Sequence, residues 1–494
     1  MSTVDLVIIH PANQKALYQG LSVSMSAIET PVWAGLTATY VRKHGFSVQI
    51  IDSEAENWSP QEVAQAVWQL QPRLIAICVY SHQPSASTQN MTAAGEIAKA
   101  CKNVMDDTPI IMYGGHVAAL PEKTLKEEAC DYVAVGEGPV TIVDYLEGME
   151  SGQTDFKGLG YRAPNLDVVY LNSAPPLIAD LNSDMPGPAY DLLDMKKYRA
   201  HNWQCFGGRD RSGYASIYTT LGCPYHCTFC AVQSPFRDGQ GSLTVNSYRF
   251  WSPKLIGEQL EWLVAAYGVK NVRIADEMFV LNVEHVKAIC LEIIHRKLDL
   301  NLWAYARVDT VKDAEMLDLL KAAGFNWLCF GFESASQSVR GAVGKGYAAE
   351  MSYDVVNRVH GAGIAVLANY IVGLPDDTEE TMEATLQEAI TLNCEFFNLY
   401  SAMAYPGSQW YLDAVKNGTT LPKTWGGYSQ HAKDCLPLPT KHLTSAQVLR
   451  FRDSAFKRYF DRQDYRDMMV KKFGPVVLEE IKPIGTHTLE RTNA

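Results

Sequence analysis

The stretch Leu221–Cys230 reads LGCPYHCTFC and decides the fold of the second half of the chain. Its cysteines Cys223, Cys227 and Cys230 have the spacing Cys-x3-Cys-x2-Cys and follow a strand-like run at Tyr214–Thr219. Three thiolates on one short loop can bind three irons of a [4Fe–4S] cluster, whose irons favour sulfur ligands. The fourth iron would then have no protein ligand, and an open position is what allows a metal centre to do chemistry.

A zinc site with His226 as fourth ligand is the alternative interpretation of this loop. Structural zinc sites usually take a second pair of ligands well downstream, and no further Cys-x2-Cys pair occurs in the chain. The spacing therefore favours the cluster.

The sequence on either side of this loop, over residues 215–405, repeats a strand–helix pattern. After the strand at Tyr214–Thr219, further strands are predicted at Val272–Ala275, Leu302–Ala306, Trp327–Phe332, Ala365–Val372 and Phe396–Ala402. Helices are predicted between them, for example at Leu255–Tyr267, Val283–Lys297, Asp313–Ala323 and Ala348–Ala362. This repeat predicts a partial (β/α)6 barrel with its site at the carboxyl ends of the strands.

Polar residues and glycines follow these predicted strands in order. They are Asp276 and Glu277, Arg307, Glu333, Gly373 and the turn at Pro406–Ser408. A carboxylate favours a neighbouring ammonium group, and an arginine can hold a carboxylate with two hydrogen bonds. For Asp276, a helix N-cap is the alternative role.

The cysteine triad with these strand ends resembles the radical SAM (S-adenosylmethionine) superfamily. The resemblance implies that SAM chelates the fourth iron and that one electron cleaves it to a 5′-deoxyadenosyl radical. It further implies that Phe229 and the backbone near Gly373 border the adenine, and that Asp276 and Glu277 face the SAM amino group. Arg307 would hold the SAM carboxylate, and Glu333 the ribose hydroxyls.

The first 150 residues alternate short apolar strands with helices. The strands are predicted at Val4–Ile9, Ser47–Ile51, Leu74–Val79, Ile110–Met112 and Tyr132–Val135. Continuous apolar strands predict a parallel sheet covered on both faces, which is a doubly wound, Rossmann-like domain. Residues 151–205 are rich in turn residues and are predicted to form a linker packed over the domain junction, with a small hairpin possible within Gly158–Val169.

The carboxyl ends of three of these strands carry distinctive residues, which are Ser81 and His82, then Gly114, Gly115 and His116, then Gly136 and Glu137. Ligands of such sheets bind at these ends, and glycine allows close approach of the backbone. The alternative interpretation is that these residues form the ordinary loops of any α/β fold. Together these stretches resemble the cobalamin-binding domain that precedes many radical SAM domains, so cobalamin is an expected cofactor.

No histidine of the chain has an aspartate two residues before it. In cobalamin carriers and mutases, an Asp-x-His-x-x-Gly motif supplies the lower axial histidine. The resemblance therefore implies that cobalamin binds here without a histidine on its lower face.

Three further cysteines, Cys78, Cys101 and Cys130, allow a second cluster, which would resemble the methylthiotransferases. Their spacing shows no compact ligand pattern, and buried cysteine behaves as a small apolar residue. We therefore predict that they pack in the core.

The segment from Gln409 to the last residue breaks the strand–helix rhythm. Aromatic residues gather between Trp410 and His431, and helices are predicted at Ser445–Asp461 and Tyr465–Phe473, with Thr444 or Ser445 as N-cap. The aromatic segment either caps the barrel mouth and helps to shape a substrate pocket, or it makes only ordinary packing contacts with the rest of the protein. The predicted divisions are thus 1–150, 151–205, 206–408 and 409–494.

The amino-acid composition narrows the classes of partner that the protein is expected to bind. The 494 residues carry 43 basic and 55 acidic side chains, a net charge of −12, which disfavours nucleic acid as a partner. No apolar run of about 18 residues predicts a membrane span. Eleven cysteines are too sparse for a disulfide framework, so a reducing cytoplasm is expected.

Three functions remain open. The first is a cobalamin-dependent radical SAM C-methyltransferase acting on a small molecule, supplied with electrons by a flavodoxin- or ferredoxin-type donor. The second is a cyclase or rearrangement enzyme with the same cofactors and no methyl transfer. The third is a cobalamin carrier or sensor, which the triad and the barrel disfavour. Methylation is favoured by analogy, because it is the commonest activity among similar proteins.

Overall fold

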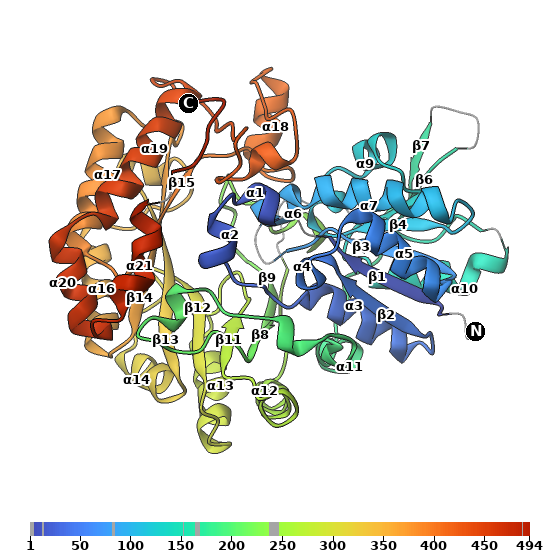
Figure 1. The fold of residues 1–494 in the computed structure, drawn as a ribbon, viewed down its shortest axis with the longest axis horizontal. Helices are drawn as coiled ribbons and strands as arrows, with labels where there is room; N and C mark the ends of the chain where they lie inside the picture. The colour runs from blue at the N-terminus through green and yellow to red at the C-terminus, as the bar shows by residue number, and fades with distance from the viewer. Residues whose placement is uncertain are drawn as a thin grey trace.

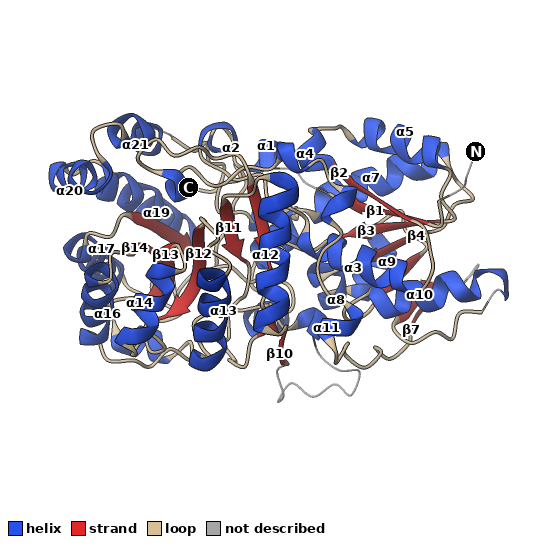
Figure 2. Ribbon diagram, turned by 90° about the horizontal axis from the view of Figure 1, so that it is seen from below, coloured by secondary structure: helices blue, strands red, loops and turns tan. Residues whose placement is uncertain are grey.

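A computed structural model describes residues 4–11, 14–81, 84–151, 153–163, 168–236, 247–486 and 488–494. His82, one of the predicted cobalamin residues, lies outside the described residues. Figures 1 and 2 show two α/β regions side by side, with the C-terminal helices against the second.

The first region contains a seven-stranded sheet of order β2-β1-β3-β4-β5-β6-β7. Its strands are β1 (Leu6–His10), β2 (Val48–Asp52), β3 (Leu74–Cys78), β4 (Ile110–Tyr113), β5 (Tyr132–Ala134), β6 (Leu159–Arg162) and β7 (Val169–Leu171). The first five run parallel, whereas β6 and β7 add an antiparallel hairpin at the edge. The sheet therefore continues past residue 150, into the segment predicted as a linker.

Alternate residues of β1 enter two different cores. Leu6 and Ile8 pack in one core with α3 and α10, whereas Val7 and Ile9 pack in a second core with α5 and α7. Both faces of the sheet are therefore covered, which confirms the doubly wound prediction. The helices of this region are α1 (Gln14–Leu17), α2 (Leu21–Ser24), α3 (Val32–Lys43), α4 (Ser53–Glu56), α5 (Pro60–Leu70), α6 (Pro84–Gln89), α7 (Met91–Val104), α8 (Gly115–Ala119), α9 (Pro121–Glu127) and α10 (Pro139–Gly148).

The second region contains a six-stranded parallel sheet of order β15-β14-β13-β12-β11-β8, which confirms the predicted partial barrel. Its strands are β8 (Tyr214–Ile217), β11 (Asn271–Ile274), β12 (Asn301–Arg307), β13 (Phe325–Glu333), β14 (Ala365–Val372) and β15 (Phe396–Ser401). Its helices are α12 (Pro253–Tyr267), α13 (Val283–His295), α14 (Ala314–Ala322), α15 (Gln337–Gly341), α16 (Glu350–Gly361) and α17 (Glu379–Leu392).

The connector and the C-terminal segment complete the fold. The connector contains α11 (Leu181–Asp184), and the C-terminal segment contains α18 (Gln409–Lys416), α19 (Ser445–Phe460), α20 (Gln463–Phe473) and α21 (Val477–Thr486). Thr444 begins α19 through a capping box with Gln447, as its sequence predicts. Among the described residues, no helix combines the length and apolarity that a membrane crossing requires.

Candidate active site

The cysteine loop is held between two short strands. β9 (Thr220–Gly222) leads into the loop and pairs antiparallel with β10 (Tyr248–Phe250). Cys223, Cys227 and Cys230 are half-buried, whereas the other eight cysteines of the chain are buried. The three thiols are free, and their partial exposure suits them to an inorganic cluster.

The donor set fits a cluster better than a single metal ion. Across the described ranges, no three His, Cys, Asp or Glu side chains converge as one metal ion would require. A [4Fe–4S] cluster needs no such convergence, because each thiolate binds a different iron. Burial raises the pKa of the Cys230 thiol to about 12.

Asp276 anchors the strand that carries this loop. Its carboxylate accepts hydrogen bonds from the backbone N–H and hydroxyl groups of both Thr219 and Thr220, at 2.5–3.1 Å. Burial raises its pKa to about 6, partly offset by these bonds. The Asp276 carboxylate therefore binds the start of β9, the strand that leads into the cysteine loop.

Arg307 lies at the end of β12 beside the cysteine loop. Its guanidinium lies 3.9 Å from the ring centre of Tyr225, and its Nη1 lies 4.0 Å from Cys227 Sγ. Asp309 accepts hydrogen bonds from Nε and Nη2 at 2.9 and 3.1 Å. The structure thus brings Arg307 next to the predicted cluster ligands.

The other residues predicted for SAM lie on the ends of neighbouring elements. Phe229 packs against Trp410, with ring centres 5.7 Å apart. Glu333 ends β13 and pairs with Lys345, a residue that was not predicted. Gly373 has φ +79°, and a Cβ there would lie 2.5 Å from the Val448 side chain of α19.

A narrow crevice joins the two regions. It is lined by Ser81, Gly115 and His116, which follow β3 and β4 of the first sheet, by Glu277, and by loop residues such as Ala231. Glu277 Oε2 is buried there and has no hydrogen-bond partner among the described residues, and burial raises the Glu277 pKa to about 8. Residues predicted for two different cofactors therefore meet at this crevice.

The remaining predicted residues of the first region shape its loops. Gly114 has φ +115°, and a Cβ would lie 2.5 Å from the Val79 carbonyl oxygen, so only glycine fits there. Gly136 also has positive φ, +92°. Glu137 is buried and pairs with Arg249 of β10 at 2.6 Å, which ties the first sheet to the cysteine loop.

His116 is enclosed by protein. Its ring lies 4.4 Å from that of Trp425, centre to centre, and only 2% of the residue is exposed. Burial, with the charge of Lys123, lowers its pKa to about 3. The imidazole is therefore neutral, and it lies in the wall of the crevice described above.

A cavity of about 240 Å³ opens between the first sheet and the barrel interior. Its aromatic wall includes Trp203, Trp303, Tyr305, Phe396 and Tyr400. These residues come from the connector and from β12 and β15, and none was predicted.

Charged residues also line this cavity. Arg273 of β11 donates to both oxygens of Glu29 at 2.6 and 2.7 Å, and His201 Nε2 lies 3.3 Å from Glu29 Oε1. An arginine within the short buried strand β11 was the sequence signal for these charged residues, because a buried charge requires a partner.

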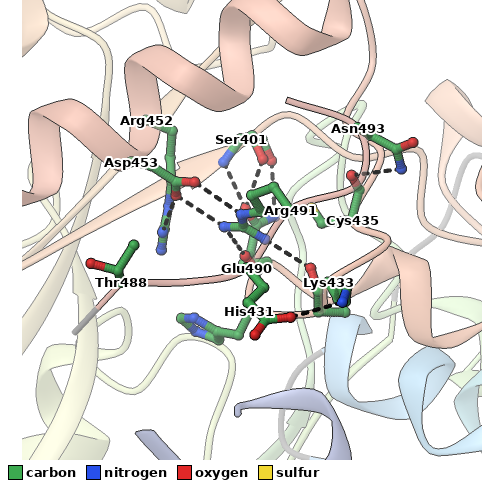
Figure 3. Close-up of polar contacts among 12 residues, drawn as sticks. Ser401, His431, Lys433, Cys435, Arg452, Asp453, Thr488, Glu490, Arg491 and Asn493 are labelled. Atoms are coloured by element: carbon green, nitrogen blue, oxygen red, sulfur yellow. Dashed lines mark hydrogen bonds and ion pairs between the residues drawn. The ribbon is translucent and has the colours of Figure 1, made fainter. Parts of the chain in front are cut away.

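Near the last residue of the chain, Arg491 makes the polar contacts that Figure 3 shows, and one of its partners lines this cavity. Arg491 binds Asp453 of α19 through two hydrogen bonds of 2.9 Å and donates to the carbonyl oxygens of Gln430 and Ala432. Gln430 in turn bonds to Ser401 at the end of β15 and lines the cavity. The aromatic segment therefore does contribute to a pocket.

Two family models match the chain, one in each of its two α/β regions. Residues 19–146 match the B12 binding domain, and residues 217–389 match the radical SAM superfamily. The chain is a radical SAM enzyme with a B12-binding domain. Its cofactors are a [4Fe–4S] cluster, SAM and cobalamin.

Curated relatives cover most of this radical SAM enzyme. An uncharacterized methyltransferase of Pyrococcus horikoshii is 28% identical over 464 residues, which are 94% of each chain. An anaerobic magnesium-protoporphyrin IX monomethyl ester cyclase of Rubrivivax gelatinosus is 26% identical over 76% of this chain and 65% of its own.

Solved structures share the fold of this radical SAM enzyme. The radical SAM methyltransferase TsrM of Kitasatospora setae, with cobalamin and a [4Fe–4S] cluster bound, aligns with a TM-score of 0.63 at 18% identity. The alignment covers 85% of this chain and 76% of TsrM. The cobalamin-dependent radical enzyme OxsB aligns with the same TM-score at 18% identity, over 84% of this chain and 55% of its own.

Cobalamin bound to the B12-binding domain is expected to have no histidine on its lower face. The reasons are the missing Asp-x-His pair and the packing of His116 against Trp425. Electron paramagnetic resonance (EPR) of the cob(II)alamin form should show no nitrogen splitting from a protein histidine. Splitting that disappears in a His116→Ala or His82→Ala variant would contradict this expectation.

Proposed function

We propose that the enzyme is a C-methyltransferase that acts on an unactivated carbon of a small molecule. The observation that supports this most is the position of the large cavity. Its walls come both from strand ends of the B12-binding domain, such as His10 and Tyr80, and from barrel residues such as Tyr305. A substrate in this cavity would lie between the two cofactor-binding regions.

When bound, SAM and the cluster supply a 5′-deoxyadenosyl radical and cobalamin supplies a transferable methyl group. The chain's own residues have supporting roles. Cys223, Cys227 and Cys230 hold three irons, and Arg307 orients the SAM carboxylate. Aromatic side chains around the cavity exclude water, which would protect a reactive carbon.

The names of the relatives support methylation over ring closure. The Pyrococcus horikoshii relative, which matches over 94% of both chains, is named a methyltransferase, and so is TsrM. The cyclases match over a smaller share of this chain. Ring closure or oxidation with the same cofactors is the competing function.

The domain limits and the electron donor belong to the same proposal. We propose limits at 1–150, 151–205, 206–408 and 409–494, with the β6–β7 hairpin of the second segment attached to the first sheet. A flavodoxin- or ferredoxin-type protein would supply the electron that each SAM cleavage requires.

The test is an anaerobic incubation of reconstituted enzyme with candidate small molecules and SAM that carries a deuterated methyl group. We expect a product that contains the label, together with S-adenosylhomocysteine and 5′-deoxyadenosine. Formation of 5′-deoxyadenosine and an altered but unlabelled substrate would contradict methylation and favour ring closure or oxidation.

A further inference from the structure

The cavity of about 240 Å³ is poor in positive charge. Among the described residues that line it, Arg273 is the only lysine or arginine. Both oxygens of the Glu29 carboxylate accept hydrogen bonds from Arg273, at 2.6 and 2.7 Å, and Arg273 is only 4% exposed. Its guanidinium also lies over the Trp303 ring, 4.7 Å from the ring centre. The described wall of the cavity therefore offers an anionic ligand no cation that is not already engaged.

Two histidines of the wall do not add a positive charge. His10 is the last residue of β1, and burial lowers its pKa to about 4, so its ring is neutral at pH 7. His201 accepts a hydrogen bond from the Ala27 backbone N–H at its Nδ1, 3.2 Å away, and its Nε2 lies 3.3 Å from Glu29 Oε1. A ring that accepts at Nδ1 is neutral and donates from Nε2. Both rings are therefore uncharged.

Glu54 is an acidic residue of the same wall, and no described lysine or arginine forms an ion pair with it. It belongs to α4 and is half-buried, and its Oε2 accepts a hydrogen bond from the Gln14 backbone N–H at 3.4 Å. Burial and the neighbouring Asp52 carboxylate raise the Glu54 pKa to about 7, which the Gln14 bond and the charges of Arg199 and Lys15 only partly offset. A carboxylate in this situation is stabilised by a ligand that brings a positive charge.

Aromatic rings surround the space beside Glu54. Burial raises the Tyr18 pKa to about 12, and the Glu54 charge adds to the shift, which places these two side chains near each other. The Tyr18 ring meets the His431 ring edge-on, with centres 5.1 Å apart, and Trp33 packs on Tyr80 at 5.0 Å. Aromatic faces bind apolar skeletons and attract cations. The cavity thus combines an aromatic wall with one carboxylate that lacks a cationic partner among the described residues.

We infer that the substrate is an organic cation, namely an amine that is protonated at neutral pH and attached to a flat or apolar skeleton. Glu54 binds the ammonium group, and the aromatic wall takes the skeleton. Carboxylates, phosphates and phosphonates are disfavoured, because Arg273 is already engaged by Glu29. This inference rests on the proposed place of the substrate in this cavity, and it does not depend on which reaction follows binding.

The experiment compares three compounds that share one ring system and differ in charge, which are 2-naphthylmethylamine, 2-naphthylmethanol and 2-naphthoate. Binding is measured by anaerobic equilibrium dialysis on enzyme loaded with the cluster and cobalamin, without SAM. The buffer is at about pH 8, above the Glu54 pKa of about 7, so that the carboxylate is ionised.

The variants are Glu54→Gln and Glu56→Gln. Glu56→Gln is the matched control, because Glu56 also belongs to α4 but pairs with Lys197 and does not line the cavity. Glutamine keeps the size of the side chain and removes its charge, so each variant tests the charge alone.

We expect the wild-type enzyme to bind the amine about tenfold or more tightly than the alcohol, because a hydrogen bond between charged groups is stronger than one to a neutral group. The naphthoate should bind more weakly than the alcohol. Glu54→Gln should lower the affinity for the amine to that for the alcohol and leave the alcohol unaffected, since the ring contacts remain. Glu56→Gln should bind all three compounds as the wild type does.

Three results would overturn the inference. The first is binding of 2-naphthoate by the wild type at least as tight as that of the alcohol, a comparison that needs no variant. The second is a preference for the amine that persists in Glu54→Gln, and the third is a wild-type enzyme that binds none of the compounds. A charge preference without any labelled-methyl product in the SAM experiment would contradict methyl transfer and leave this inference standing, because binding is measured without SAM.

Discussion

Replacing Cys223, Cys227 and Cys230 together by alanine is expected to remove the iron from the enzyme. Wild-type protein reconstituted anaerobically should contain about four irons per chain, as this cluster type requires. The triple variant should contain almost none, since the chain's other cysteines are buried. Iron and sulfide analysis, together with the EPR spectrum of the reduced protein, measures this.

Two single variants serve as controls for this change. Cys290 and Cys435 are buried cysteines outside the loop, so Cys290→Ala and Cys435→Ala should keep the full iron content. Retention of a full cluster by the triple variant would contradict the assignment of the loop.

Replacing Arg307 by alanine is expected to weaken SAM binding by about tenfold to a hundredfold, because a lost bond between charged groups typically costs roughly 1.5–3 kcal/mol. The guanidinium lies 4.0 Å from Cys227 Sγ, so a carboxylate that chelates the fourth iron would lie within its reach. Loss of Arg307 should also reduce 5′-deoxyadenosine formation at saturating SAM, because SAM would be misplaced as well as weakly held.

Arg458→Ala is the matched control for this prediction. Arg458 also binds a carboxylate, Glu383, but it is exposed and lies on α19. Its loss should leave SAM binding and cleavage unchanged. An Arg307→Ala enzyme with wild-type values for both would exclude Arg307 from the SAM site.

The sequence predicted the strands well, because buried parallel strands are continuous apolar runs. The run predicted at Leu74–Val79 is the strand Leu74–Cys78, and Ala365–Val372 matches without change. The cysteine spacing was equally informative, because all three predicted ligands lie on one loop. The glycines at 114 and 136 marked real turns with positive φ.

Contacts between distant segments could not be predicted. Glu29 and Arg273 are 244 residues apart and Glu137 and Arg249 are 112 apart, yet both pairs join the two regions. The resemblance implies that Asp276 lies near the SAM amino group, and it gave no sign that the same carboxylate accepts hydrogen bonds from Thr219 and Thr220. A strand end determines where a side chain begins, but the surrounding packing determines what it contacts.

One measurement tests most directly whether cobalamin and the cluster meet at the same crevice. The reduced cluster and cob(II)alamin each carry an unpaired electron, so EPR of enzyme loaded with both reports whether the two spins interact. The crevice that contains Glu277, Ser81 and Ala231 predicts mutual broadening or splitting of the two signals. Two unperturbed signals, each identical to that of enzyme loaded with one cofactor, would contradict a shared active site.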